Sequence, residues 1–357
     1  MMKTSSLCAA TSSVFFLAFF LAISSFLFFF SVDLVKGIPT LLKGNIKART
    51  TTNTLANNEN GSVCRALALG GGGDRGAYEA GVLKYLVENL PADQVKYQVI
   101  GGISAGSINS VGFGQFPIGQ ERQGLDFLLR HWTSLTASDV YKNWPLGIAQ
   151  GFLFKTALFN TDPLHKFLTR NVNLTSIRNS GRRILMGATN LNTNKYEQFD
   201  QYTDDLVEAT RASSAVPGVL EAVSMKGSLY VDGGAKYMTP ISDVIAECFK
   251  FTNASHVNVD VILAIGDFQF ANYLENIQTT PFILLRTLFN VVDDIFTKDI
   301  TNAQIAFGNK VTFRIFKPSK WLPGWFLGFD HSEEMIDIGY QDARNVLNSI
   351  RNSRRVQ

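Results

Sequence analysis

Cysteine and histidine are scarce in this chain, which has three cysteines and four histidines among 357 residues. No C-x-x-C pair occurs, and no histidine lies within five residues of another, so the common local zinc motifs are excluded. We therefore expect no metal and no cofactor. Two alternatives stay open for Cys64 and Cys248, which either pair in an oxidising compartment or remain buried thiols.

The chain has no large excess of positive or negative charge, because its formal net charge is only +3 and no run of five like charges occurs. This balance gives little support to a nucleic-acid partner. The sequence shows no internal repeat and no second break in composition. Residues 64–357 are therefore predicted to form a single α/β domain.

Charge is absent altogether from Val14–Val32, nineteen residues that include eight phenylalanines. A helix of this length spans roughly 28 Å, close to the thickness of a bilayer core. Residues 1–37 are predicted to be either a cleaved signal peptide, with Lys3 as its basic start, or an uncleaved membrane anchor. Residues 38–63 are predicted to be a polar linker. The protein is thus expected at a membrane or in the secretory pathway.

Three N-x-S/T sequons, at Asn60, Asn173 and Asn253, do not decide between these alternatives. Chance alone predicts about three such sites in a chain of this composition.

The rest of the chain alternates strand-like and helix-like segments, which is typical of a mainly parallel sheet with crossover helices. Turns, glycines and prolines mark the boundaries. Strands are predicted over 65–69, 97–102, 182–191, 195–199, 228–234, 257–267 and 310–318. Helices are predicted over 78–90, 105–111, 120–135, 204–214, 281–296 and 332–350.

Four consecutive glycines, Gly70–Gly73, follow the first predicted strand. Their backbone amides suit either a phosphate at a helix start or a developing oxyanion during acyl transfer. The spacing Gly71, Gly73, Gly76 also fits the dinucleotide pattern G-x-G-x-x-G, which needs an acidic residue at the end of the second strand. That strand ends instead in Gly-Gly-Ile-Ser, so the oxyanion role is favoured.

The segment Gly102-Ile103-Ser104-Ala105-Gly106 is a G-x-S-x-G placed where a predicted strand gives way to a helix. This context is what a nucleophile elbow requires. Ser104 is the candidate nucleophile, and the amide of Ala105 is a natural second oxyanion donor.

An activated serine needs a base, and Asp232 at the start of an Asp-Gly-Gly is the first candidate. A carboxylate at the end of an apolar strand is partly desolvated, which raises its pKa and strengthens it as a base. A Ser104–Asp232 dyad competes with a turn aspartate and with a histidine-dependent α/β-hydrolase using His256 or His331.

The ordered set GGGGDRG, GISAG, ASSAVPGV and DGG resembles the patatin-like phospholipases. The segments LFNTDPLHKFL and FDHSEEMIDIGYQDA are also similar to parts of that family. The resemblance implies a single three-layer patatin-like domain with a serine nucleophile at Ser104 and an aspartate base at Asp232. It implies an oxyanion hole from Gly71, Gly72 and Gly73, with Ala105. The predicted supporting residues of these motifs are Arg75, Gly76, Gly102, Gly106, Gly233 and Gly234.

The predicted function is therefore a lipid acyl ester hydrolase of the phospholipase A or lysophospholipase type, with a membrane lipid or other acyl ester as its partner. One departure is Met238, where the family commonly carries asparagine. A membrane-tethered protein without turnover thus stays an alternative. Arg75 either holds the glycine loop or is a surface arginine. Residues 144–159 are predicted to be a lid, an acyl groove or core, and 321–329 an interfacial loop or core.

Overall fold

The structure is a computed structural model and describes residues 62–265 and 280–355. The predicted apolar segment and linker before residue 62 lie outside the described residues. Within the described ranges, no helix has the length and apolar character needed to cross a membrane.

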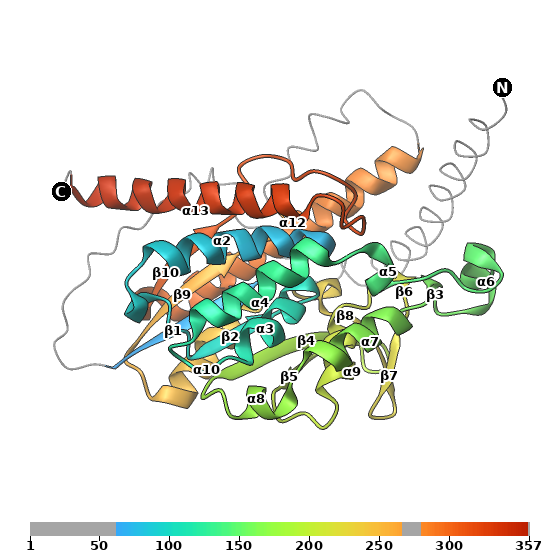
Figure 1. Cartoon of the computed structure of the whole chain (residues 1–357), viewed down its shortest axis with the longest axis horizontal. Helices are drawn as coiled ribbons and strands as arrows, with labels where there is room; N and C mark the ends of the chain where they lie inside the picture. The colour runs from blue at the N-terminus through green and yellow to red at the C-terminus, as the bar shows by residue number, and fades with distance from the viewer. Residues whose placement is uncertain (1–61, 266–279, 356–357) are drawn as a thin grey trace, which may run out of the picture.

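A mainly parallel sheet forms the middle of the domain, in the order β10-β9-β1-β2-β4-β8-β7, with β5 also paired to β4 (Figure 1). The five strands from β10 to β4 are parallel, and β5, β7 and β8 are added in antiparallel pairs. The strands are β1 (Val63–Leu69), β2 (Val99–Gly102), β4 (Arg183–Asn190), β5 (Lys195–Asp200), β7 (Val223–Met225), β8 (Ser228–Asp232), β9 (His256–Ile262) and β10 (Val311–Phe316). A separate parallel pair joins β3 (Ala157–Phe159) and β6 (Gly218–Leu220).

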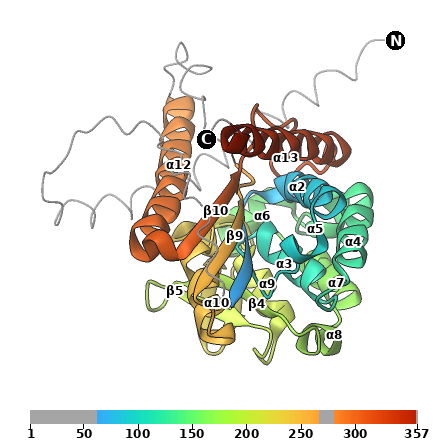
Figure 2. The same cartoon turned by 90° about the vertical axis from the view of Figure 1, so that its left-hand side faces the viewer.

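Helices cover both faces of the sheet, which gives the predicted three layers. Figure 2 shows α12 on one side and α2, α4 and α13 on the other. Helix α10 lies on the same face of the sheet as α12. The longer helices are α2 (Gly76–Asn89), α3 (Ala105–Gly114), α4 (Glu121–Ser134), α7 (Asp162–Asn171), α9 (Leu206–Ser213), α10 (Ile241–Thr252), α12 (Thr280–Phe307) and α13 (Ser332–Arg355). The shorter ones are α5 (Ala137–Val140), α6 (Gly147–Phe154) and α8 (Leu174–Arg178).

Strand β1 shows how sequence alternation builds the two cores. Leu67 and Leu69 face the α2, α4 and α13 layer, while Ala66 and Ala68 face α10 and α12. All four side chains are fully buried, because a central parallel strand has helices on both faces.

The disulfide Cys64–Cys248 joins the start of β1 to α10, with the two Cα atoms 5.8 Å apart. Both cysteines are fully buried. Of the two alternatives left open by the sequence, the structure contains the bond.

Predicted and observed boundaries agree to within a few residues except at three places. The helix predicted over 281–296 continues to Phe307 in α12, and the helix predicted over 332–350 continues to Arg355 in α13. The strand predicted to reach residue 267 ends at Ile262. Asp205 caps α9, because its carboxylate accepts a hydrogen bond from the Glu208 amide at 3.0 Å.

Candidate active site

Ser104 lies at the turn between β2 and α3, as the G-x-S-x-G pattern predicts. Its φ of 54° and ψ of −125° place it in a strained conformation that non-glycine residues seldom adopt. The two glycines make this turn possible because the backbones approach closely there. A Cβ on Gly102 would overlap the carbonyl oxygen of Gly106, and a Cβ on Gly106 would lie 2.5 Å from the carbonyl oxygen of Leu69. The pattern is therefore sterically required.

The end of α9 fixes the backbone of Ser104. The Ser104 amide donates to the Ser213 carbonyl at 3.0 Å, and the Ser214 hydroxyl donates to the Ser104 carbonyl at 3.1 Å. Sequence reasoning assigned no role to these two serines, although they belong to the ASSAVPGV segment used for the family resemblance. The only available signal was their position inside that motif.

Asp232 ends β8 and meets Ser104 across the sheet edge. Its carboxylate accepts a hydrogen bond from the Gly234 amide at 2.7 Å and lies close to the Ser104 hydroxyl. Burial raises the pKa of Asp232 to about 7, although the Ser104 hydroxyl and the Gly234 amide act in the opposite direction. Gly233 packs against the Gly187 carbonyl of β4, so the two glycines after the aspartate both serve this turn.

The glycine loop lies beside Ser104, but its four residues have different hydrogen bonds. The amides of Gly70 and Gly71 donate to the carbonyls of Ile262 and Met238 at 3.0 and 2.9 Å. Among the described residues, none accepts a hydrogen bond from the amides of Gly72, Gly73 or Ala105.

This pattern corrects the predicted oxyanion hole. Gly71 was expected to supply an amide, but that amide is already bound by Met238. Gly72, Gly73 and Ala105 are left as candidate donors. Gly73 has a φ of 63°, and a Cβ there would overlap the Phe326 carbonyl oxygen, so this position requires glycine.

Arg75 is 8% exposed and is not a surface arginine. Its guanidinium contacts the Asp74 carboxylate at 2.8 Å. Asp74 in turn ties the glycine loop to residues 326–329, because its amide donates to the Phe326 carbonyl and its carboxylate accepts from the Phe329 amide. Burial raises the pKa of Asp74 to about 6, and the neighbouring Arg75 opposes this shift. Gly76 follows and packs against the Trp132 ring.

A small apolar pocket opens beside Ser104. Its walls come from the glycine loop, α3, α4, α5, α7, β6 and the loop before α13. The lining residues are Gly73, Ser104, Ala105, Ile108, Trp132, Leu135, Val140, Leu164, Phe167, Ser214, Val216, Leu220, Leu327 and Phe329.

The sequence left alternatives open for residues 144–159 and 321–329, and these two segments differ in whether they line this pocket. Residues 321–329 contribute Leu327 and Phe329 to its wall. Residues 144–159 contribute none, because Leu158 and Phe159 are core while Leu153 and Phe154 of α6 are exposed. The lid and acyl-groove roles of that segment stay predictions.

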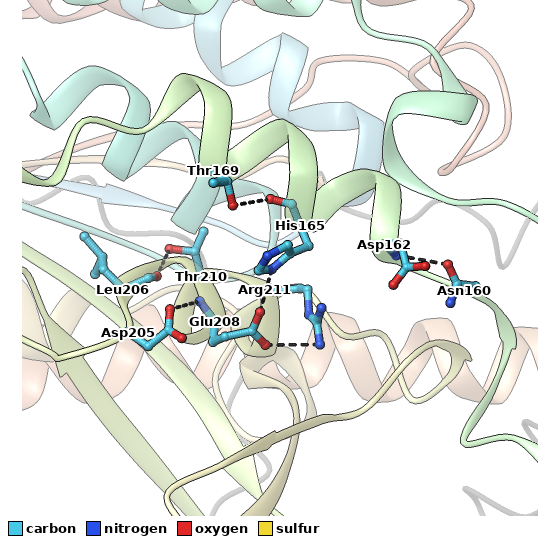
Figure 3. A network of polar contacts seen from close by, with 9 residues as sticks. All are labelled: Asn160, Asp162, His165, Thr169, Asp205, Leu206, Glu208, Thr210 and Arg211. Atoms are coloured by element: carbon cyan, nitrogen blue, oxygen red, sulfur yellow. Dashed lines mark hydrogen bonds and ion pairs between the residues drawn. The ribbon is translucent and has the colours of Figure 1, made fainter.

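All four histidines are described, and none hydrogen-bonds to Ser104 or Asp232. His165 of α7 contacts Glu208 of α9 at 2.6 Å, and Arg211 contacts the other oxygen of that carboxylate at 3.1 Å (Figure 3). His131 packs between aromatic rings.

Of the two histidines proposed as alternative bases, His256 is not placed for that role. His256 begins β9, opposite Val63 at the start of β1, whereas Ser104 follows the end of the neighbouring strand. His256 therefore lies at the amino-terminal ends of the parallel strands, whereas Ser104 lies at their carboxyl-terminal ends. His331 lies beside Glu334, 3.6 Å away.

No group of three or more histidine, cysteine, aspartate or glutamate side chains is arranged to hold a metal within residues 62–265 and 280–355.

Two of the solved structures that this chain resembles, both at low identity, are VipD and ExoU. VipD from Legionella pneumophila is 11% identical, with 81% of this chain and 67% of that chain covered and a TM-score of 0.35. ExoU in its complex with SpcU, from the type III secretion system of Pseudomonas aeruginosa, is 14% identical, with a TM-score of 0.36. That match covers 80% of this chain and 51% of ExoU, so the chain spans about half the length of ExoU.

No curated protein matches the sequence. The model of the family described as patatin-like phospholipase matches residues 67–245, half of the chain. The matched range contains the glycine loop, Ser104 and Asp232, and it runs into α10. The chain therefore belongs to the patatin-like phospholipase family.

Proposed function

We propose that the protein is a lipid acyl ester hydrolase of the phospholipase A or lysophospholipase type that uses Ser104 and Asp232 as a catalytic dyad. One observation carries the proposal. The Ser104 hydroxyl lies within reach of a buried carboxylate, at the wall of an apolar pocket and beside amides that donate to no described residue. Family membership supports lipid ester hydrolysis as the reaction class.

In this mechanism the Ser104 oxygen attacks the ester carbonyl while its proton passes to Asp232. The amides of Gly72, Gly73 and Ala105 donate to the oxyanion that forms. Collapse of this intermediate expels the alcohol, which takes the proton from Asp232. Water then loses a proton to Asp232, attacks the acyl-serine and releases the fatty acid, and Ser104 recovers its proton.

The proposed substrate is a phospholipid or lysophospholipid whose acyl chain enters the apolar pocket. Leu164, Phe167 and Leu220 offer only hydrocarbon surface to such a chain. Binding energy there comes from removing the chain from water, at about 0.8 kcal/mol per methylene.

Fluorophosphonate labelling of the full chain tests the nucleophile. We expect one covalent adduct on Ser104, none in Ser104→Ala, and release of fatty acid from phosphatidylcholine vesicles by the wild type alone. A folded wild-type protein without adduct and without release would overturn the proposal and favour the membrane-tethered protein that lacks turnover.

We also propose that the domain folds in an oxidising compartment, reached through the apolar segment as signal peptide or anchor. The buried Cys64–Cys248 disulfide supports this, because such bonds are rare in reducing compartments. The bond closes a separation of 184 residues. Replacing both cysteines with alanine should lower the free energy of unfolding by about 2–4 kcal/mol, measured by urea denaturation.

The compartment itself is tested by expressing the full chain in a eukaryotic cell line. Asn173 and Asn253 are exposed, so we expect glycosidase-sensitive mass at both sequons. Thr175→Ala and Ser255→Ala should each remove one glycan. Alkylation of Cys64 and Cys248 without prior reduction, together with unmodified sequons, would place the domain in a reducing compartment instead.

A further inference from the structure

A carboxylate from outside the range matched by the family model lies beneath the candidate site. Asp299 belongs to α12, and its side chain is buried. One oxygen, Oδ2, accepts hydrogen bonds from the amides of Met238 and Thr239 at 2.9 and 3.0 Å. Hydrogen bonds to an ionised acceptor are roughly twice as strong as neutral ones, so this single side chain fixes a two-residue stretch of backbone.

That stretch touches the glycine loop. The Met238 carbonyl accepts from the Gly71 amide at 2.9 Å. A Cβ on Gly71 would lie 3.3 Å from the Met238 Cε atom, and one on Gly70 would lie 3.2 Å from the Thr239 hydroxyl oxygen. Residues 238–239 therefore pack against Gly70 and Gly71 and hold the backbone of Gly71 by a hydrogen bond.

The same stretch also touches the turn that carries Asp232. The Met238 sulfur would lie 2.7 Å from a Cβ on Gly234, whose amide donates to the Asp232 carboxylate. Residues 238–239 thus lie between the two parts of the site. They contact them through backbone and a methionine side chain, where the family commonly has asparagine.

We propose that Asp299 is a positioning residue for ester hydrolysis, which holds residues 238–239 and thereby places the amides of Gly72 and Gly73 relative to Ser104. This inference rests on the proposed function. Asp299 does not contact the reacting atoms. It acts through the backbone of Met238.

The surroundings of Asp299 make its charge dependent on pH near neutrality. Burial raises the pKa of Asp299 to about 7, the two amides oppose the shift, and Asp243 of α10 adds to it. Asp243 in turn accepts from the Tyr196 hydroxyl of β5 at 3.0 Å, and Tyr237 lies close to both carboxylates. Protonation of Asp299 removes the charge from the acceptor of both hydrogen bonds.

Asp299→Ala should lower kcat about 10- to 100-fold on a short-chain ester, with KM changed less than about threefold, since a displaced donor costs about this much. Asp299→Asn should recover part of the loss, because its amide oxygen still accepts. Asp243→Asn is the matched control. It changes a half-buried carboxylate in the same cluster that does not bind residues 238–239, so kcat should stay within about twofold of wild type.

Three readouts separate positioning from a general loss of folding. Fluorophosphonate titration gives kcat per intact site, hydrogen exchange follows the Gly71 amide, and the pH profile counts ionising groups. We expect faster exchange at Gly71 in Asp299→Ala. We also expect an acid limb that needs two ionisations in wild type and one in Asp299→Asn.

An unchanged kcat per titrated site in Asp299→Ala would overturn the inference, as would an equal loss in Asp243→Asn. If Asp299→Ala does not fold, an acid limb in Asp299→Asn identical to wild type would overturn it. A wild type that neither labels nor hydrolyses would instead refute the proposed function. In that case unchanged Gly71 exchange in Asp299→Ala would show separately that Asp299 does not hold the loop.

Discussion

Asp232→Asn should abolish hydrolysis of a short-chain ester nearly as completely as Ser104→Ala, with a loss of about 10³-fold or more in kcat for each. An amide cannot take the serine proton, although it keeps the shape of the side chain and an acceptor for the Gly234 amide. The double variant should be no slower than either single one, because residues that act as one unit give non-additive losses. Initial rates of p-nitrophenyl ester hydrolysis, normalised to folded protein, provide the measurement.

The control for this experiment is Asp243→Asn, in which a half-buried carboxylate away from Ser104 is neutralised in the same way. Burial also raises the pKa of Asp243. Activity retained in Asp243→Asn and lost in Asp232→Asn assigns the effect to the dyad. Asp232→Asn with more than about a tenth of the wild-type rate, a barrier change under about 1.4 kcal/mol, would show that Asp232 is not the base.

The fall in activity at acid pH also tests whether Asp232 is the base. Burial raises the pKa of Asp232 to about 7, and the base must be ionised to accept the serine proton. Activity should therefore fall as the pH drops below about 7. Single replacement of His165, His256 or His331 by alanine should leave the limb in place, since none of these imidazoles contacts the dyad.

Local patterns predicted the parts of the site whose geometry is set within a few residues. The G-x-S-x-G could be interpreted correctly because the close approach of Gly102 and Gly106 depends on the turn itself. The sheet was predictable for a similar reason. In β1, leucine and alanine alternate, so apolar side chains point to both faces of the strand, as expected for a strand with helices on both sides.

The missed features depend on contacts between distant segments. The Gly71 amide is bound by Met238, which lies more than 160 residues later, and Asp299 sits in a helix whose pattern looks amphipathic. No spacing in the sequence relates these positions. The same limit applies to Ser213 and Ser214, which hold Ser104 across about 110 residues.

Asp232→Asn should also make the protein more stable at neutral and alkaline pH, the opposite of its effect on activity. In the unfolded chain the carboxyl has its ordinary pKa near 3.8, and in the folded protein burial raises the pKa to about 7. Between these values the folded state holds a proton that the unfolded state has lost. The free energy of unfolding of the wild type therefore falls as pH rises through this window, by about 1.4 kcal/mol per unit.

Asparagine does not titrate, so this fall in the free energy of unfolding with rising pH is absent in Asp232→Asn. Its gain over wild type should be close to zero below about pH 4 and should reach up to about 4 kcal/mol above pH 7. Urea denaturation of both proteins at pH 4, 6 and 8, with the disulfide kept oxidised, measures the difference. A gain independent of pH would point to packing, and a loss at pH 8 would mean that the bond from the Ser104 hydroxyl outweighs the burial of the charge. A base that is ready to accept a proton at neutral pH destabilises the fold that holds it, because the same burial causes both effects.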